Sequence, residues 1–168
     1  YAAVECSLLD FEVDPPQARQ LALEVADAQL ELVFAADSKL LDCPPHNIDV
    51  AQCLAIAKDF DHVIINTSTP SLKNDCKVAE AIKAQKPATK IGFIGAHTMV
   101  LPTETLKASP AVDWVARKEF DYTCKEVAED RELSTIAGLS YKDRDGKIKH
   151  NPEREMIPNM DALPWVAD

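Results

Sequence analysis

The sequence predicts an α/β fold in which a five-stranded parallel sheet is flanked by helices and followed by a C-terminal β-hairpin and an extended linker. Short apolar runs, typical of buried parallel strands, alternate with segments whose apolar residues recur at helical spacing. Repeated strand-helix alternation builds parallel sheets through crossover connections. The Asp145-Gly146 pair near the end of the alternation favours a hairpin turn. Together these patterns indicate a Rossmann-like or flavodoxin-like architecture.

Five strands are expected, and the second is the least sharply marked. Two stretches, Leu30–Ala35 and Lys39–Asp42, are alternatives for it, and the pattern alone favours neither. The third strand is a β-branched run short enough to be buried on both faces. The first, third, fourth and fifth strands are expected at Ala2–Leu9, His62–Thr67, Lys90–Gly95 and Trp114–Ala116.

Helices are expected between these strands, and two of them carry start signals. Asp49 and Gln52 form the pattern of a capping box. Thr69 and Pro70 fit an N-cap followed by proline at the first helical position. The helices are expected at Gln17–Gln29, Asp49–Phe60, Thr69–Pro87, Pro102–Ala108 and Phe120–Asp130.

The last part of the sequence changes character, which predicts a division of the chain. Gly138–Tyr141 and Lys147–Lys149 flank the Asp145-Gly146 turn and are expected to pair. Prolines at positions 152, 158 and 164 preclude regular structure after the hairpin. We therefore expect a Rossmann-like domain over residues 1–134 and a hairpin with a linker over residues 135–168.

Composition limits the classes of partner. The chain has 168 residues, 46% of them apolar, which is enough for one domain with a substantial core. Its formal charge is -10, from 28 acidic against 18 basic residues, and it contains no dense run of Lys or Arg. Nucleic acids and anionic membrane surfaces are therefore not expected partners. No apolar run approaches the roughly 20 residues that a membrane-spanning helix needs.

The five cysteines are scattered and form no CxxC or CxxxCxxC cluster that would hold zinc or an iron–sulfur centre. We expect them to be buried thiols. An odd number of cysteines without a signal peptide favours a reducing compartment, so a cytoplasmic location is expected.

Small and hydroxyl-bearing residues follow two neighbouring strands. Thr67-Ser68-Thr69 ends the third strand, and Gly95-Ala96-His97 ends the fourth. In open α/β sheets, ligands bind outside the carboxyl ends of the strands, where the strand order reverses. The hydroxyls and free N–H groups there suit a phosphate or a cofactor tail. Simple helix capping by Thr69, and a tight turn with a solvent-facing His97, are the alternatives.

Three further residues are candidates with weaker signals. Asp42 and His46 invite a metal or cofactor site, because a carboxylate can orient an imidazole, but a solvated loop histidine explains them equally well. Glu119 follows the fifth strand and could cap the last helix or face the same crevice. No Ser-His-Asp order, HExxH, P-loop or GxGxxG pattern is present, so hydrolysis and dinucleotide binding are not indicated.

The order of these pieces resembles the N-terminal cobalamin-binding domain of cobalamin-dependent radical S-adenosylmethionine enzymes. The resemblance covers most of the chain, and its most specific element is the junction after the fifth strand. The matching segments are Pro15-Pro16, Asp42, Asn66–Thr69, Ile94–His97, Pro102–Glu104, Lys118–Asp121, Ile136–Tyr141 and Met160–Pro164. Within the family, Leu41–Asn47 and the run from Asn66 to Trp165 are most similar to the radical proteins associated with hopanoid biosynthesis.

The resemblance implies a division of labour. This chain would hold cobalamin through Asp42, His46, Thr67, Ser68, Thr69, Gly95, Ala96, His97 and Glu119. S-adenosylmethionine and the iron–sulfur cluster would belong to a C-terminal radical domain absent from this sequence, and a hopanoid lipid would be the substrate of the whole enzyme. The fragment alone would have no turnover.

Departures from the family pattern refine these implications. Ile94 and Lys118 replace two family glycines, which puts close backbone approach at those points in doubt. The DxHxxG element of other cobalamin domains is missing, so a cofactor without a protein imidazole on cobalt is expected. A flavodoxin-like flavin-binding module, a receiver-like signalling module and a docking domain without cofactor remain alternatives. A receiver needs an aspartate where Asn66 stands, although Lys118 lies where a receiver has its lysine.

Overall fold

A computed structural model of the chain describes residues 2–7, 37–43 and 47–156, with side chains described for residues 41, 43 and 47–156. The expected helix Gln17–Gln29, the candidate strand Leu30–Ala35, His46 and the Met160–Pro164 segment lie outside the described residues.

The described strands form one seven-stranded sheet in the order β2-β1-β3-β4-β5-β6-β7. Strands β1 to β5 are parallel, whereas β6 and β7 are antiparallel to their neighbours. The α/β fold class is therefore confirmed, and the expected hairpin extends the sheet beyond β5. The strands are β1 Ala2–Ser7, β2 Asp37–Asp42, β3 His62–Asn66, β4 Lys90–Ile94, β5 Trp114–Ala116, β6 Leu139–Lys142 and β7 Ile148–His150.

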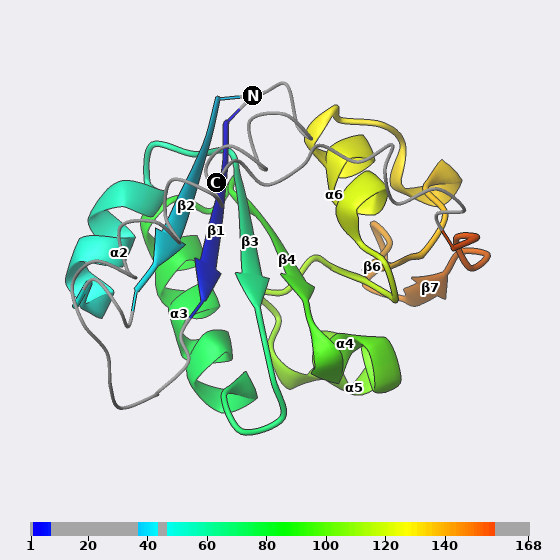
Figure 1. The fold of residues 1–168 in the computed structure, drawn as a ribbon, viewed down its shortest axis with the longest axis horizontal. Helices are drawn as coiled ribbons and strands as arrows, with labels where there is room; N and C mark the ends of the chain where they lie inside the picture. Colours follow the sequence, from blue (N-terminus) through cyan, green and yellow to red (C-terminus); the bar gives the residue numbers. More distant parts are fainter. Residues whose placement is uncertain (1, 8–36, 44–46, 157–168) are drawn as a thin grey trace, which may run out of the picture.

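Strand order places the reversal point of the sheet between β1 and β3, since β2 lies on one side of β1 and the later strands on the other. Arrowheads of β1, β3 and β4 point to the same edge of the sheet, where α4 begins (Figure 1). The position of β2 confirms Lys39–Asp42 as part of the second strand.

The described helices follow the expected alternation, with two differences. The capping box of α2 is present, because Asp49 accepts from the Gln52 N–H and Gln52 from the Asp49 N–H. Helix α3 begins two residues later than expected, and a short helix, α4, forms where only a turn was expected. The helices are α2 Val50–Ala57, α3 Leu72–Gln85, α4 Ala96–Val100, α5 Pro102–Ala108 and α6 Asp121–Ala128, followed by a 3₁₀ turn at Leu133–Thr135.

Two apolar clusters bury the two faces of the sheet. Side chains alternate along β3, so that Val63 and Ile65 join the cluster beneath α2, α3 and α5, whereas Ile64 joins the cluster beneath α6. On β4, Gly92 lies opposite Trp114, and a Cβ on Gly92 would lie 2.1 Å from the indole ring. This glycine therefore makes room for the largest buried side chain of the second cluster.

Residues after the hairpin lie against the domain itself. Asn151 donates through Nδ2 to the carbonyls of Leu133 and Ile136, at 2.6 and 2.7 Å. Arg154 donates to the Thr123 hydroxyl at 3.0 Å and pairs with Glu126. The segment from Asn151 to Arg154 thus fixes the end of β7 to α6 and the 3₁₀ turn.

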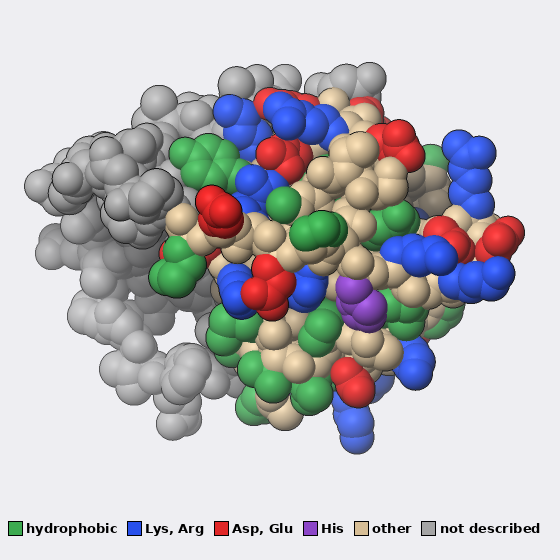
Figure 2. Space-filling model, turned by 90° about the vertical axis from the view of Figure 1, so that its right-hand side faces the viewer, with side chains coloured by type: hydrophobic (Ala, Val, Ile, Leu, Met, Phe, Trp, Pro, Cys, Tyr) green, Lys and Arg blue, Asp and Glu red, His purple; other side chains and the backbone are tan. Residues whose placement is uncertain are grey.

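The described surface is mixed in charge. On the face drawn in Figure 2, lysine and arginine side chains lie among acidic ones and form no continuous basic area. The four described cysteines, Cys43, Cys53, Cys76 and Cys124, are all buried, as expected. Within the described ranges, no helix combines the length and the apolar character required to cross a bilayer.

Candidate functional site

The candidate site lies where β3 and β4 end side by side. The Thr67 N–H donates to the Ile94 carbonyl at 2.9 Å, which continues the pairing of the two strands past their last residues. Immediately afterwards the chain turns into α3 on one side and into α4 on the other. Six of the predicted residues, Thr67 to Thr69 and Gly95 to His97, therefore lie at the same edge of the sheet.

Gly95 allows the two turns to approach closely. Its φ of 102° and ψ of -176° belong to a conformation that is essentially restricted to glycine. A Cβ at this position would lie 2.3 Å from the Asn66 Oδ1 and 2.6 Å from the Thr67 carbonyl oxygen. Any other residue would separate the β3 and β4 turns and change the shape of the site.

Beneath these turns, a buried carboxylate organises two hydroxyls. Thr67 Oγ1 donates to Asp75 Oδ2 at 2.6 Å, and Ser71 Oγ donates to the same oxygen at 2.7 Å. Asp75 has no exposed surface, and its Oδ1 has no hydrogen-bond partner among the described residues. Burial raises the pKa of Asp75 above its ordinary value, while the hydroxyls of Thr67 and Ser71 act in the opposite direction.

Ser68 is held by the same network. Its N–H donates to Ser71 Oγ at 2.9 Å, and the two serine hydroxyl oxygens are also 2.9 Å apart. The sequence expectation of an N-cap at Thr69 and a first helical residue at Pro70 is wrong, because Ser68 and Ser71 form a local hydroxyl turn that delays α3 until Leu72.

His97 is buried, at 7% exposure, so the alternative of a solvent-facing histidine is wrong. Helix α4 turns its ring inward, where Nδ1 lies 3.0 Å from Thr69 Oγ1 and Nε2 has no partner. The neighbouring Thr98 donates to the Gly95 and Ala116 carbonyls, at 2.8 and 3.1 Å. Helix α4 is thereby tied to β5 as well as to the turn after β3.

The other predicted residues are not brought into this group by a described contact. Asp42 ends β2, which is separated from β3 by β1, and its side chain is not described. Glu119 follows β5 and is half-buried. It does not cap α6, since Phe120 is the N-cap residue and Asp121 is the acid in the first turn. His46 lies outside the described residues.

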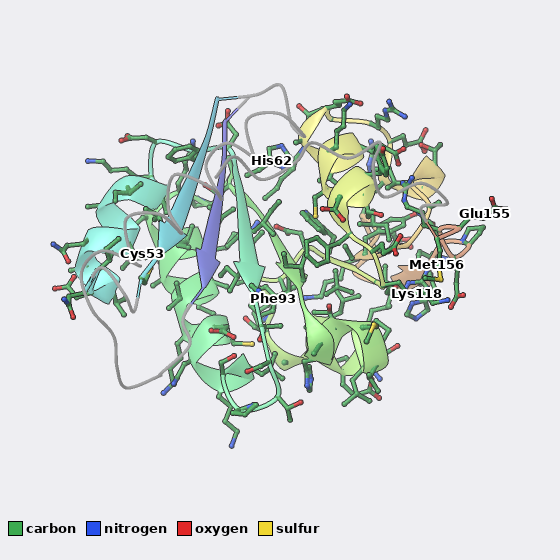
Figure 3. The ribbon with its side chains drawn as sticks, viewed as in Figure 1. Cys53, His62, Phe93, Lys118, Glu155 and Met156 are labelled. Atoms are coloured by element: carbon green, nitrogen blue, oxygen red, sulfur yellow. The ribbon has the colours of Figure 1, made fainter. Side chains whose placement is uncertain are left out.

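Lys118 keeps the backbone shape of the glycine that it replaces in the family pattern. Its φ is 57°, in the left-handed region that favours glycine. Its ammonium group pairs with Glu153, in the segment after the hairpin, and Figure 3 shows the position of Lys118 in this part of the molecule. The turn after β5 therefore has a left-handed backbone conformation at Lys118.

Comparisons with known proteins give one sequence relative and a set of structural neighbours. No protein-family model matches the chain. An uncharacterized methyltransferase of Pyrococcus horikoshii, PH0819, is 33% identical over 134 residues, which cover 76% of this chain and 29% of the relative. The chain thus spans less than a third of that protein.

The structural neighbours include several forms of OxsB, a cobalamin-dependent S-adenosylmethionine radical enzyme. The structure with aqua-cobalamin bound gives a TM-score of 0.73 at 17% identity, and the structure with aqua-cobalamin and S-adenosylmethionine gives 0.69 at 16%. Both matches cover 92% of this chain and 22% of OxsB. At this level of identity the likeness establishes a shared fold.

Sequence reasoning missed the residues below the surface of the site. Ser71 and Asp75 are separated by one helical turn, and Asp75 shares the buried stripe of α3 with Cys76, Ala79 and Ile82. An acid next to such an apolar stripe, four residues after a serine, is the signal that could have identified the pair.

The arrangement is suited to holding a ligand. Hydroxyls, exposed turn backbone and one buried carboxylate lie together, whereas the described residues contain no group of three or more His, Cys, Asp or Glu side chains that could hold a metal ion. The chemistry that these side chains offer is hydrogen bonding and shape.

Proposed function

We propose that this chain is the cobalamin-binding domain of a larger cobalamin-dependent radical S-adenosylmethionine enzyme. The observation that carries the proposal is the Gly95 turn packed against the Thr67–Thr69 turn, at the carboxyl ends of β3 and β4 and next to the reversal point between β1 and β3. The likeness in fold to OxsB, which has been solved with aqua-cobalamin bound, supports a corrinoid as the occupant.

The residues present fit such a group. Gly95 lets the turn after β3 lie close beside the turn after β4, and Ala96 exposes only a methyl group, so a broad ligand could approach the backbone at Ala96. Ser68 and Thr69 would hold its polar periphery, and Thr67 and His97 would support them from beneath. When bound, cobalamin would supply redox and group-carrying chemistry at cobalt that no side chain of this edge provides.

His97 is not placed to be a cobalt ligand. One ring nitrogen contacts Thr69, and the other is enclosed in the protein. His62 lies at the opposite end of β3, and His150 contacts Thr103 and Ser140 in the region of the hairpin. These positions support the proposal of a cofactor without a protein imidazole on cobalt, as far as the described histidines are concerned.

The finer parts of the proposal concern the whole enzyme. Residues 135–168 would lead toward a C-terminal radical domain that binds S-adenosylmethionine and an iron–sulfur cluster. Similarity to a methyltransferase favours transfer of a one-carbon group, and the hopanoid side chain is the substrate that the sequence resemblance implies. A cytoplasmic location is part of the same proposal, and no nucleic acid partner is proposed.

A flavin is the principal rival ligand, because flavodoxin has the same 2-1-3-4-5 strand order. The purified chain would be mixed with hydroxocobalamin or with flavin mononucleotide, desalted, and examined by absorbance. We expect the corrinoid to be retained and the flavin to be lost. Retention of flavin with loss of the corrinoid would overturn the proposal.

A matched pair of variants locates the binding in that assay. Ser68→Ala removes a hydroxyl at the proposed site, whereas Ser134→Ala removes an exposed hydroxyl that donates to Glu132 in the 3₁₀ turn. We expect Ser68→Ala to retain less corrinoid and Ser134→Ala to retain as much as the unmodified chain.

A further inference from the structure

Asp75 is the one feature of the site that simple shape complementarity does not require. It is fully buried, and one of its oxygens has no partner. An unpartnered buried polar atom costs stability, and more so when the group is charged. A neutral hydrogen-bonding residue could hold the threonine and the serine with a smaller loss of stability. The position of this carboxylate therefore points to a role in setting the direction of the hydrogen bonds.

The direction of each hydrogen bond follows from the number of protons available. Thr67 and Ser71 converge on Asp75 Oδ2 at 2.6 and 2.7 Å, separations typical of hydroxyls that donate to a carboxylate. The single hydroxyl proton of Ser71 is thereby committed to Asp75. Ser71 Oγ then has two lone pairs for incoming donors.

Ser68 supplies both of those donors. Its N–H and its hydroxyl each lie 2.9 Å from Ser71 Oγ. Since Ser71 has no proton left to give, the Ser68 hydroxyl must be the donor in the contact between the two oxygens. Within the part of the chain that the structure describes, Ser68 Oγ receives only a long contact from the Ser71 N–H, at 3.4 Å, and so keeps a lone pair for a ligand.

We infer that Asp75, acting through Ser71, fixes the half-buried Ser68 hydroxyl as a hydrogen-bond acceptor, so that the site takes the N–H of a carboxamide at this point and disfavours a carboxylate or phosphate oxygen. The inference rests on the proposed function, since cobalamin carries primary amides around its corrin ring. It also replaces the sequence expectation of a phosphate at these hydroxyls with a different ligand group. Asp75 is thus a positioning residue.

The test compares hydroxocobalamin with its isomeric monocarboxylic acids, in each of which one side-chain amide is hydrolysed. Dissociation constants for the full 168-residue chain would be measured by absorbance titration. We expect at least one acid isomer to bind about tenfold more weakly than the amide, because its oxygen meets an acceptor at Ser68. The other isomers serve as internal controls for the loss of an amide elsewhere.

Two variants test whether Asp75, through Ser71, sets the orientation of the Ser68 hydroxyl. Ser71→Ala removes the acceptor that orients the Ser68 proton. Asp75→Leu removes the carboxylate that accepts the Ser71 proton, so that this proton can turn toward Ser68. In both variants we expect the preference for the amide over the sensitive acid isomer to fall below about threefold, whereas Ser134→Ala keeps the preference of the unmodified chain. Thermal unfolding would establish that each variant is folded.

The outcomes separate the two claims. If hydroxocobalamin itself does not bind, the proposed function fails. If it binds but every acid isomer binds equally well, the function stands and the inference is overturned. Retention of the full preference in folded Asp75→Leu or Ser71→Ala also overturns it, because the orientation of the Ser68 hydroxyl would then not depend on Asp75 and Ser71.

Discussion

Lys118 holds a backbone conformation that a side chain makes costly. Its φ of 57° places it in the left-handed region, where the Cβ approaches the following carbonyl oxygen and costs roughly 1–2 kcal/mol. The turn after β5 is maintained because Arg117 and Lys118 are both tied to the segment after the hairpin, the former to the Asn151 carbonyl and the latter to Glu153.

This strain leads to a prediction about two variants that lack the Lys118 ion pair. Lys118→Gly relieves the left-handed conformation, whereas Lys118→Ala retains it. We expect the free energy of unfolding of the glycine variant to exceed that of the alanine variant by about 1 kcal/mol, measured by urea denaturation. Equal stabilities would show that the backbone at residue 118 relaxes without strain.

At the scale of the element, the two ends of β3 serve different purposes. Asn66 ends the strand at the candidate site, whereas His62 begins it at the opposite edge, as Figure 3 shows for His62. The His62 side chain is buried, and its Nδ1 has no partner. Burial lowers the pKa of His62, and the nearby Lys90 lowers it further, while Asp130 and Asp61 act in the opposite direction.

A pH dependence of stability follows from His62. Between its depressed folded pKa and about 6.5 in the unfolded chain, the unfolded state binds more protons. The stability from this residue is therefore complete above about pH 6.5 and decreases as the pH falls toward the folded pKa. We expect the thermal midpoint to fall over this range, and to fall less steeply in His62→Gln. An unchanged slope in the variant would contradict this assignment.

The elements that could be predicted from sequence are those with local signals. A short β-branched run predicted β3, and the Asp49-Gln52 pair predicted the start of α2. Thr69-Pro70 misled because its pattern is shared by a helix start and by a polar turn, and the contacts between Ser68 and Ser71 decide between them. Helix α4, with five residues, is too short for periodicity to reveal.

The location of the exposed turns of the site could also be predicted, but the hydrogen bonds beneath them could not. Hydroxyls and a glycine after two parallel strands indicated the location of a ligand edge. Nothing local in the sequence shows that Thr67 and Asp75, eight residues apart, share a hydrogen bond. The contact between Thr69 and His97 joins turns that are 28 residues apart and likewise depends on the packing of β3 beside β4.

At the scale of the whole molecule, the turns of the proposed site and the C-terminal hairpin lie at different parts of one sheet. The hydroxyl turns and Gly95 lie at the carboxyl ends of β3 and β4. The β6-β7 hairpin instead extends the sheet beyond β5, and the residues that follow it pack on α6. The proposed binding edge and the hairpin therefore lie at different places on the sheet of a chain that spans 29% of one relative and 22% of OxsB.

Hydrogen–deuterium exchange with and without excess hydroxocobalamin tests this division most directly. We expect the cofactor to slow exchange in peptides covering residues 66–72 and 95–101, where the two turns meet, and to leave residues 139–150 of the hairpin unchanged. Protection of the hairpin without protection of the two turns, or no protection in the presence of bound cobalamin at either place, would contradict the location of the site.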